Sequence, residues 1–307
     1  MNNAASVKDR LRNRSKETGK TLQELLTVYG IERTIYRISI SKYVGNFTLK
    51  GGIFLYAIFN GSYSRATTDI DLLAEKVSNS FDEMKRVFSE IFMLEADDPL
   101  RFDLNTLAVN LITENKTYHG VNVSIKAYLD RTEIPISIDV GFGDVIVPGR
   151  VIMDFPVVLS DEHPHIYAYS LCSSIAEKFE VIVSLAYDNS RLKDYYDLYV
   201  LATTHDFDGE EMVEAVRETF ENRHTSLDEI VAFEDGFADD PLRQSRWKSF
   251  VKRKMPMLPI TLDDTIIMLE RFMGPVAEAV KAGTKLDSRW SHECQAWIYH
   301  GIHLNPL

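Results

Sequence analysis

The amino-acid sequence predicts an α/β lobe followed by a mainly helical lobe. The centre of the chain contains segments that alternate between apolar and polar residues, as half-buried strands do. After Pro156 the apolar residues instead recur with a helical period. The 307 residues suffice for one large two-lobed protein or for two domains. A division near residues 160–164 gives a first lobe of residues 1–160 and a second of residues 161–307.

Composition limits the classes of function open to the chain. The 46 acidic residues outnumber the 34 basic ones, which excludes a globally basic nucleic-acid coat but not a local basic stripe. The longest apolar run, residues 53–59, is far shorter than the ~20 residues that span a bilayer. Cys172 and Cys294 cannot form a disulfide framework, and we expect both thiols to be buried in a reducing compartment. With a polar, basic start, these features predict a cytoplasmic protein without a membrane segment.

The first third of the chain carries helix and strand signals around two glycines. Over residues 21–36 the apolar side chains recur at spacings of mostly three or four, which predicts a packed helix. Residues 47–49 predict a short strand, and Gly51 and Gly52 follow it closely. Residues 53–60 predict a helix that ends at Gly61.

The centre of the chain predicts antiparallel strands. Residues 121–129 and 134–140 both alternate between apolar and polar side chains, and the polar residues 130–133 between them have the length of a hairpin connection. Residues 107–112 are a candidate third strand. Further along, residues 169–201 and 262–282 have helical periods.

Two carboxylates two residues apart, Asp69 and Asp71, are the sharpest chemical feature. Alternate residues of a strand share a face, so both carboxylates would project together while Ile70 and Leu72 pack behind them. Like charges that close repel, and they persist best beside a divalent cation or a basic group. The alternative is a solvated strand end or a turn.

The residues upstream of these acids suit phosphate binding. Gly51 and Gly52 stand at a predicted strand-to-helix junction, where the absence of Cβ atoms lets backbone N–H groups approach a phosphate. Arg65 offers a guanidinium, and Thr67 and Thr68 offer hydroxyls immediately before the acids. A simple turn is the alternative explanation of the glycine pair.

A third carboxylate, Asp139, lies on the polar face of the predicted strand 134–140. If that strand lies beside Asp69 and Asp71, three carboxylates converge on one patch. Such a trio suits Mg²⁺-dependent phosphoryl or nucleotidyl transfer, in which a carboxylate can also serve as the base. Alternatively, Asp139 caps the loop of residues 141–143.

The helical lobe carries a lysine and a ladder of charges. Lys178 lies at the margin of an apolar stripe; it can extend into solvent or, directed inward, neutralise a phosphate. Arg191, Asp194 and Asp197 are spaced by three after Ser190, a predicted N-cap, so they neighbour one another on a helix. Leucines on the same side turn these charges toward the protein. A local ion-pair ladder is the alternative.

A basic run with interleaved aromatic residues follows in the C-terminal third. It could hold an RNA backbone and stack on a base, or it could be a solvated helix face with core aromatics. Its candidate RNA-binding residues are Arg243, Arg246, Trp247, Lys248, Lys252, Arg253 and Lys254.

The ordered set of motifs resembles the AbiEii/AbiGii (MenT-like) nucleotidyltransferase toxin family over roughly residues 5–205. The motifs are Phe47-Thr48-Leu49-Lys50-Gly51-Gly52, Arg65-Ala66-Thr67-Thr68-Asp69-Ile70-Asp71-Leu72, Ile138-Asp139-Val140-Gly141-Phe142-Gly143-Asp144, Ala176-Glu177-Lys178 and Asn189-Ser190-Arg191-Leu192-Lys193-Asp194-Tyr195-Tyr196-Asp197-Leu198. The sequence departs from the broader superfamily at Ile53, where a serine is usual, so backbone groups or Thr67 and Thr68 would replace that hydroxyl.

The resemblance implies a DNA-polymerase-β-like nucleotidyltransferase lobe with a mixed sheet, and a helical lobe that completes the active-site cleft. It implies a toxin of a bacterial toxin–antitoxin or phage-defence system that uses a nucleoside triphosphate and Mg²⁺ (or Mn²⁺). The acceptor in relatives is often the 3′ end of tRNA. A cognate antitoxin, or a kinase that phosphorylates the toxin, would neutralise it.

The same resemblance implies roles for individual residues. The implied catalytic residues are Asp69, Asp71, Lys178 and Asp197. The implied metal ligands are Asp69, Asp71 and Asp139. It implies a nucleotide-binding junction at Gly51 and Gly52. From their chemistry and their place in these motifs, we expect further nucleotide-binding residues: Lys50, Arg65, Thr67, Thr68, Arg191, Lys193 and Asp194.

Two other functions stay open at the level of sequence. A small-molecule nucleotidyltransferase, such as an antibiotic adenylyltransferase, would use the same metal site with an acidic cleft for a cationic substrate. A non-catalytic regulatory protein could keep the fold without turnover, although the joint presence of Asp69, Asp71, Lys178 and Asp197 argues against a degraded site.

Overall fold

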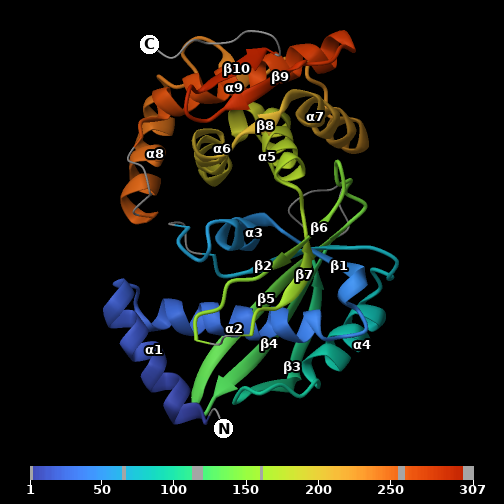
Figure 1. The fold of residues 1–307 in the computed structure, drawn as a ribbon, viewed down its shortest axis with the longest axis vertical. Helices are drawn as coiled ribbons and strands as arrows, with labels where there is room; N and C mark the ends of the chain where they lie inside the picture. The colour runs from blue at the N-terminus through green and yellow to red at the C-terminus, as the bar shows by residue number, and fades with distance from the viewer. Residues whose placement is uncertain (1–2, 64–66, 113–119, 160–161, 255–259, 300–307) are drawn as a thin grey trace. The chain divides into compact units, whose positions relative to one another are not determined.

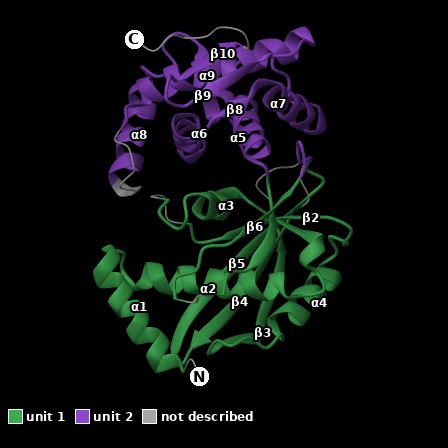
Figure 2. Cartoon of the chain, viewed as in Figure 1, with its two compact units in different colours: residues 1–144, 150–169 green, residues 145–149, 170–307 purple. Residues whose placement is uncertain are grey.

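The computed structural model describes residues 3–63, 67–112, 120–159, 162–254 and 260–299. The chain divides into two compact units (Figure 2). The first unit comprises residues 1–144 and 150–169, and the second comprises residues 145–149 and 170–307.

A seven-stranded mixed sheet, counted over the described residues, forms the centre of the first unit (Figure 1). Its strand order is β3-β4-β5-β2-β1-β7-β6. The pairs β2–β5 and β1–β7 are parallel, and the other neighbouring pairs are antiparallel. The strands are β1 (Phe47–Lys50), β2 (Ile70–Ala74), β3 (Leu100–Leu111), β4 (Val121–Leu129), β5 (Thr132–Phe142), β6 (Val151–Asp154) and β7 (His165–Ala168). The prediction of an α/β lobe with a mixed sheet is confirmed.

The hairpin of β4 and β5 follows the predicted alternation. Along β4 every second side chain, from Val121 to Leu129, is buried, because one face of the sheet packs into the core. The connection is shorter than predicted: Leu129 already pairs with Thr132, so the turn consists of residues 130 and 131 rather than 130–133. Asp130 takes a left-handed backbone conformation in this turn, with φ 55°.

The helices of the first unit are α1 (Ala4–Thr18), α2 (Leu22–Ser39), α3 (Gly51–Ile58) and α4 (Phe81–Phe92), with a short 3₁₀ helix η1 (Val44–Asn46). Thr21 and Glu24 form a capping box at the start of α2, each side chain accepting from the other's backbone N–H. At Gly30 a Cβ atom would lie 2.7 Å from Cγ2 of Ile134, so α2 lies against β5 too closely for a larger residue. The helix predicted over residues 21–36 is confirmed.

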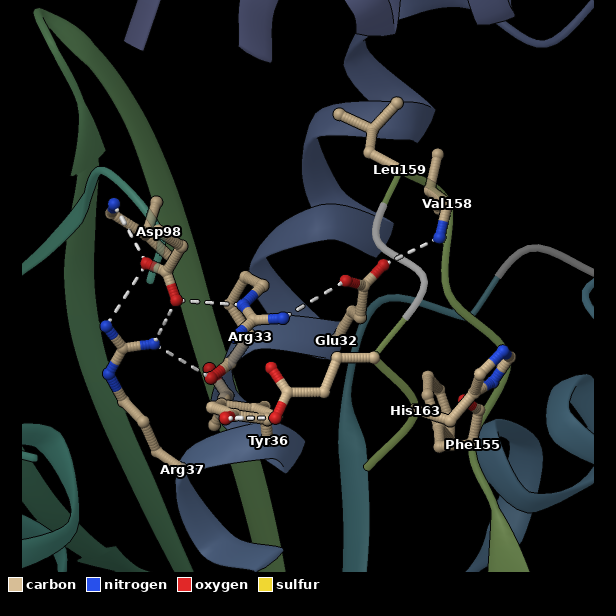
Figure 3. Close-up of polar contacts among 12 residues, drawn as sticks. Glu32, Arg33, Tyr36, Arg37, Asp98, Phe155, Val158, Leu159 and His163 are labelled. Carbon is tan, nitrogen blue, oxygen red and sulfur yellow. Dashed lines mark hydrogen bonds and ion pairs between the residues drawn. The ribbon is translucent and has the colours of Figure 1, made fainter. Parts of the chain in front are cut away.

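A buried charged cluster fastens α2 to two loops (Figure 3). The Asp98 carboxylate accepts hydrogen bonds from Arg33 Nε at 2.8 Å and from Arg37 Nη1 at 2.9 Å. Glu32 is fully buried, and its Oε2 accepts a hydrogen bond from the backbone N–H of Val158 at 2.7 Å. Removal from water raises the pKa of Glu32 to about 7. The cluster therefore couples the segment after β6 to a titratable carboxyl group.

Helices dominate the second unit (Figure 1). They are α5 (Leu171–Leu185), α6 (Leu192–Thr204), α7 (Gly209–Arg223), α8 (Pro241–Lys254) and α9 (Leu262–Ala282), with the 3₁₀ helices η2 (Ala186–Asp188) and η3 (Val231–Phe233). A small antiparallel sheet of order β10-β9-β8 accompanies them. Its strands are β8 (Phe207–Asp208), β9 (Ser288–Ser291) and β10 (Ala296–Tyr299). Within the part of the chain that is described, no helix is both long and apolar enough to cross a membrane.

Several local predictions were wrong. The strands β6 to β10 were not predicted, because two to four residues are too few to show an alternating pattern. Cys172 is buried as expected, but Cys294 is exposed. Ser190 does not cap α6: the cap position is Arg191, whose backbone N–H donates to Asn189 Oδ1 at 2.8 Å.

Candidate active site

The sheet of the first unit aligns four polar residues on neighbouring strands. Lys50 on β1 pairs with Asp71 on β2, Asp71 pairs with Asp139 on β5, and Asp139 pairs with Asn122 on β4. Residues directly opposite one another on adjacent strands share a face of the sheet. The predicted neighbourhood of Asp71 and Asp139 is therefore present, with a cation at one end of the row and an amide at the other.

The strand-to-helix junction at Gly51 and Gly52 is built around Asp71. Gly51 has φ 66°, and a Cβ atom on it would lie 2.0 Å from Oδ2 of Asp71. The backbone N–H of Gly52 donates to the same Oδ2 at 3.3 Å. A residue with a side chain at position 51 would thus suffer both a strained backbone and a collision with the carboxylate.

Asp69 takes a different position from the one predicted. Strand β2 begins at Ile70, so exposed Asp69 immediately precedes the strand instead of belonging to it. Thr68 Oγ1 donates to Asp69 Oδ2 at 3.0 Å, and Thr67 Oγ1 donates to the backbone carbonyl of Asp69 at 3.3 Å. Both threonine hydroxyls therefore donate to oxygen atoms of Asp69 and stabilise its conformation. Arg65, the predicted guanidinium of this segment, lies outside the described residues.

The donors for a metal ion are carboxylate oxygens, the ligands that Mg²⁺ and Mn²⁺ prefer. Asp139 Oδ1 accepts a hydrogen bond from Asn122 Nδ2 at 2.7 Å, which fixes the orientation of that carboxylate. Over the described residues, no group of three or more His, Cys, Asp or Glu side chains is placed to hold an ion. The protein would therefore hold an ion here through one or two carboxylates, as is common where substrate phosphates supply the further ligands.

Lys50 has partners that the sequence did not reveal. Its ammonium lies 2.7 Å from Oδ2 of Asp144 and 5.0 Å from the centre of the Tyr169 ring. The Lys50 and Asp144 side chains are 15% and 5% exposed, so the ion pair is largely screened from water. The only sequence signal for Asp144 was its place at the end of the motif 138–144.

In the second unit, Lys178 joins α5 to α6 through two buried carboxylates. Its Nζ lies 2.7 Å from Asp197 Oδ2 and 3.3 Å from Asp194 Oδ1. Lys178 is 9% exposed, Asp194 2% and Asp197 0%. These three charged side chains therefore face the interior of the protein and not the solvent. Arg191 completes the network, because its Nε donates to Asp194 Oδ2 at 2.8 Å.

A pocket of about 720 Å³ in the second unit brings together two segments that the sequence analysis treated separately. Residues 190–193 at the start of α6 line one part of it. Ser245, Arg246, Ser249 and Phe250 of α8 line the rest. The predicted nucleotide-binding residues Arg191 and Lys193 thus share a pocket with the predicted RNA-binding residue Arg246.

The rest of the basic run is divided by the structure. Trp247 is 2% exposed and its indole N–H donates to the carbonyl of Ile260, so Trp247 is a core aromatic residue, as the alternative interpretation of the basic run had it. The guanidinium carbon of Arg243 lies 3.9 Å from the centre of the Phe237 ring. Lys248 and Lys252 are exposed, and the side chains of Arg253 and Lys254 lie outside the described residues.

Comparison with known proteins identifies the family of this chain. The family model for the nucleotidyl transferase AbiEii toxin of type IV toxin–antitoxin systems matches residues 33–272. Because the match covers most of the chain, the chain is a nucleotidyltransferase. More narrowly, the chain belongs to the AbiEii toxin family.

Two solved structures from Helicobacter pylori are similar to this chain at 14% identity. One is described as a candidate nucleotidyltransferase; its match has a TM-score of 0.47 and covers 82% of this chain and 94% of that one. The other, JHP933, has a TM-score of 0.44, with 83% and 92% covered. A search of curated proteins found no match.

Proposed function

We propose that this nucleotidyltransferase toxin transfers a nucleoside monophosphate from a nucleoside triphosphate to the 3′ hydroxyl of an RNA, with tRNA as the acceptor and Mg²⁺ as the ion. The acceptor oxygen bonds to the α-phosphorus, the bond between the α- and β-phosphates breaks, and pyrophosphate leaves. The hydroxyl proton passes to a carboxylate, for which Asp139 is the candidate, oriented by Asn122. A cognate antitoxin is the expected partner of a type IV family member.

The observation that carries this proposal is the fit of the Gly51–Gly52 junction around Asp71. Asp69 and Asp71 would hold the ion, and an ion bound there would neutralise charge on the phosphates. The junction also forms the N-terminus of α3, and a helix N-terminus with little side-chain bulk suits a phosphate. Lys50, on the strand beside Asp71, adds a cation to the same row.

Lys178 is the proposed triphosphate contact of the second unit. Asp194 and Asp197 hold its ammonium between them, which fixes a point charge that would otherwise move on a flexible stem. Asp197 acts in this arrangement as a positioning residue. The proposal is supported by the burial of both carboxylates, because the carboxylates of an ordinary surface ion pair stay exposed to water.

The pocket of the second unit favours RNA over a cationic antibiotic as the acceptor. Its lining includes Arg191, Lys193 and Arg246, and none of the described residues that line it is acidic. Cations attract a phosphate backbone and repel a cationic small molecule. The small-molecule alternative predicted an acidic cleft instead.

The test uses purified full-length protein, Mg²⁺, bulk tRNA and each of the four α-labelled nucleoside triphosphates in turn. Labelled RNA with at least one nucleotide is the expected result. Absence of labelled RNA with all four would contradict the tRNA proposal. A parallel reaction with Asp69→Asn combined with Asp71→Asn should give no product, and label that survives this double substitution would contradict the metal assignment.

A further inference from the structure

The second unit contains a pocket that gathers basic side chains, in a chain whose net charge is -12. Arg191 and Lys193 from the start of α6 and Arg246 from α8 line it, together with three serines. Among the residues that the structure describes, no carboxylate lines the pocket, although acidic residues outnumber basic ones by 46 to 34 in the whole sequence. Cations gathered against the overall charge of a protein mark a local site for an anion.

One pocket cation is held in place from behind. The guanidinium of Arg191 donates through Nε to Asp194, which is 2% exposed and also contacts Lys178. This contact fixes the orientation of the planar guanidinium of Arg191 through its Nε. A pre-oriented guanidinium loses little conformational entropy when it binds a phosphate.

Phe250 gives the pocket an aromatic surface. Its ring centre lies 5.7 Å from the Trp247 ring on the same helix and 5.9 Å from the Tyr196 ring of α6, which it meets edge-on at 67°. These two buried rings support Phe250 from inside the unit, while Phe250 itself is only half-buried and lines the pocket. A supported aromatic ring beside cations is the combination on which single-stranded nucleotides stack.

The size and chemistry of the pocket distinguish an RNA nucleotide from a free triphosphate. Its volume of about 720 Å³ is that of a site for a nucleotide-sized ligand. A nucleoside triphosphate arrives with Mg²⁺, which takes carboxylate ligands, and the described lining of the pocket offers none. The singly charged phosphodiesters of an RNA strand need only the cations and hydroxyls that are present.

We propose that this pocket binds one unpaired nucleotide near the 3′ end of the RNA acceptor, with the base stacked on Phe250 and the adjoining phosphate between Lys193 and Arg246. Arg191 then contacts the acceptor strand, and not the incoming triphosphate as expected from the sequence. The inference rests on the proposed function for the identity of the strand, and it adds the site that would hold it.

The test measures binding without turnover. A fluorescent single-stranded RNA of about ten nucleotides is titrated into the full chain in the absence of nucleoside triphosphate, at several salt concentrations. Arg246→Ala should weaken binding at least fivefold and flatten the dependence of log K on log salt by about 0.7. Phe250→Leu, which keeps apolar bulk against Trp247 and Tyr196, should also weaken binding at least fivefold.

The matched control is Arg271→Ala, which removes an exposed arginine of α9 that does not line the pocket. It should change the affinity less than twofold. Equal weakening by Arg271→Ala and Arg246→Ala would overturn the proposal, because it would show diffuse attraction only. Unchanged RNA affinity in both pocket variants would also overturn it.

A second titration with Mg²⁺ and labelled nucleoside triphosphate separates the two candidate ligands. Arg246→Ala should leave triphosphate affinity unchanged, and loss of that affinity with RNA binding intact would overturn the inference. Since no step requires product formation, failure of the transfer assay leaves the binding result standing. Failure of the binding assay likewise leaves the transfer result standing.

Discussion

Asp71 occupies the space that a side chain at Gly51 would need. The position of a Cβ atom on Gly51 is 2.0 Å from Oδ2 of Asp71, and the backbone at Gly51 has φ 66°. The carboxylate also accepts from the backbone N–H of Gly52. The geometry of the acid and the identity of the glycine are therefore coupled, although twenty positions separate them in the sequence.

Gly51→Ala should damage both folding and transfer. A left-handed backbone costs about 1–2 kcal/mol for a residue with Cβ, and the collision with Asp71 adds to this cost. Thermal melts should show a lower midpoint, and the labelled product should fall to background. Gly45→Ala is the matched control, because nothing lies within 4 Å of a Cβ there. If Gly51→Ala transfers label as well as Gly45→Ala, the coupling has no functional role.

Lys178→Met should destabilise the protein by about 3–5 kcal/mol, because it leaves Asp197 buried without its cation. Adding Asp197→Asn should restore much of this stability, since Asp194 keeps its contact with Arg191. Transfer should nevertheless stay absent in the double variant. Denaturant unfolding and the labelling assay, run on the same samples, separate the two effects. A stable double variant that transfers label normally would rule out a catalytic role for Lys178.

Expression of the wild type without an antitoxin should slow bacterial growth. The double variant Lys178→Met with Asp197→Asn, at an equal protein level on an immunoblot, should not slow it, because the proposed triphosphate contact is removed. Growth curves after induction make the comparison. Equal growth inhibition by both proteins would show that toxicity does not depend on Lys178.

Stability should fall as pH rises through the range set by Glu32. Burial raises the pKa of this carboxyl from its unfolded value of 4.5 to about 7, so the folded state binds the proton more tightly. Between those values the folded protein holds more protons than the unfolded chain, and the free energy of unfolding declines by up to about 3 kcal/mol.

The matching variant is Glu32→Gln, which keeps an acceptor for the Val158 N–H without a titrating group. Unfolding free energies measured at pH 5 and pH 7.5 should differ less for Glu32→Gln than for the wild type. An equal difference in both proteins would remove Glu32 as the source of the dependence.

Much of the fold could be predicted from sequence because the elements are locally consistent. The capping residues Thr21 and Glu24 and the alternation of β4 and β5 are short-range signals. The predicted helix over residues 262–282 has the same bounds as α9. The five strands β6 to β10 escaped prediction because each depends on its sheet partner rather than on its own pattern.

The candidate site could be predicted in its residue types but not in its contacts. The pairing of Asp71 with Asp139 is a matter of register between strands far apart in the chain. The Asp144 partner of Lys50 and the burial of Trp247 arise from tertiary packing. The shared pocket of Lys193 and Arg246 likewise depends on how α6 meets α8, which no local spacing records.

The measurement that tests nucleotidyl transfer most directly follows both ends of the triphosphate. With tRNA, Mg²⁺ and the preferred nucleotide, α-labelled substrate should yield labelled RNA, while γ-labelled substrate should yield labelled pyrophosphate and unlabelled RNA. Both signals should vanish with Asp69→Asn combined with Asp71→Asn, in protein whose melting curve shows that it is folded. Label from the γ-phosphate on RNA, or transfer that persists in the double variant, would contradict the account.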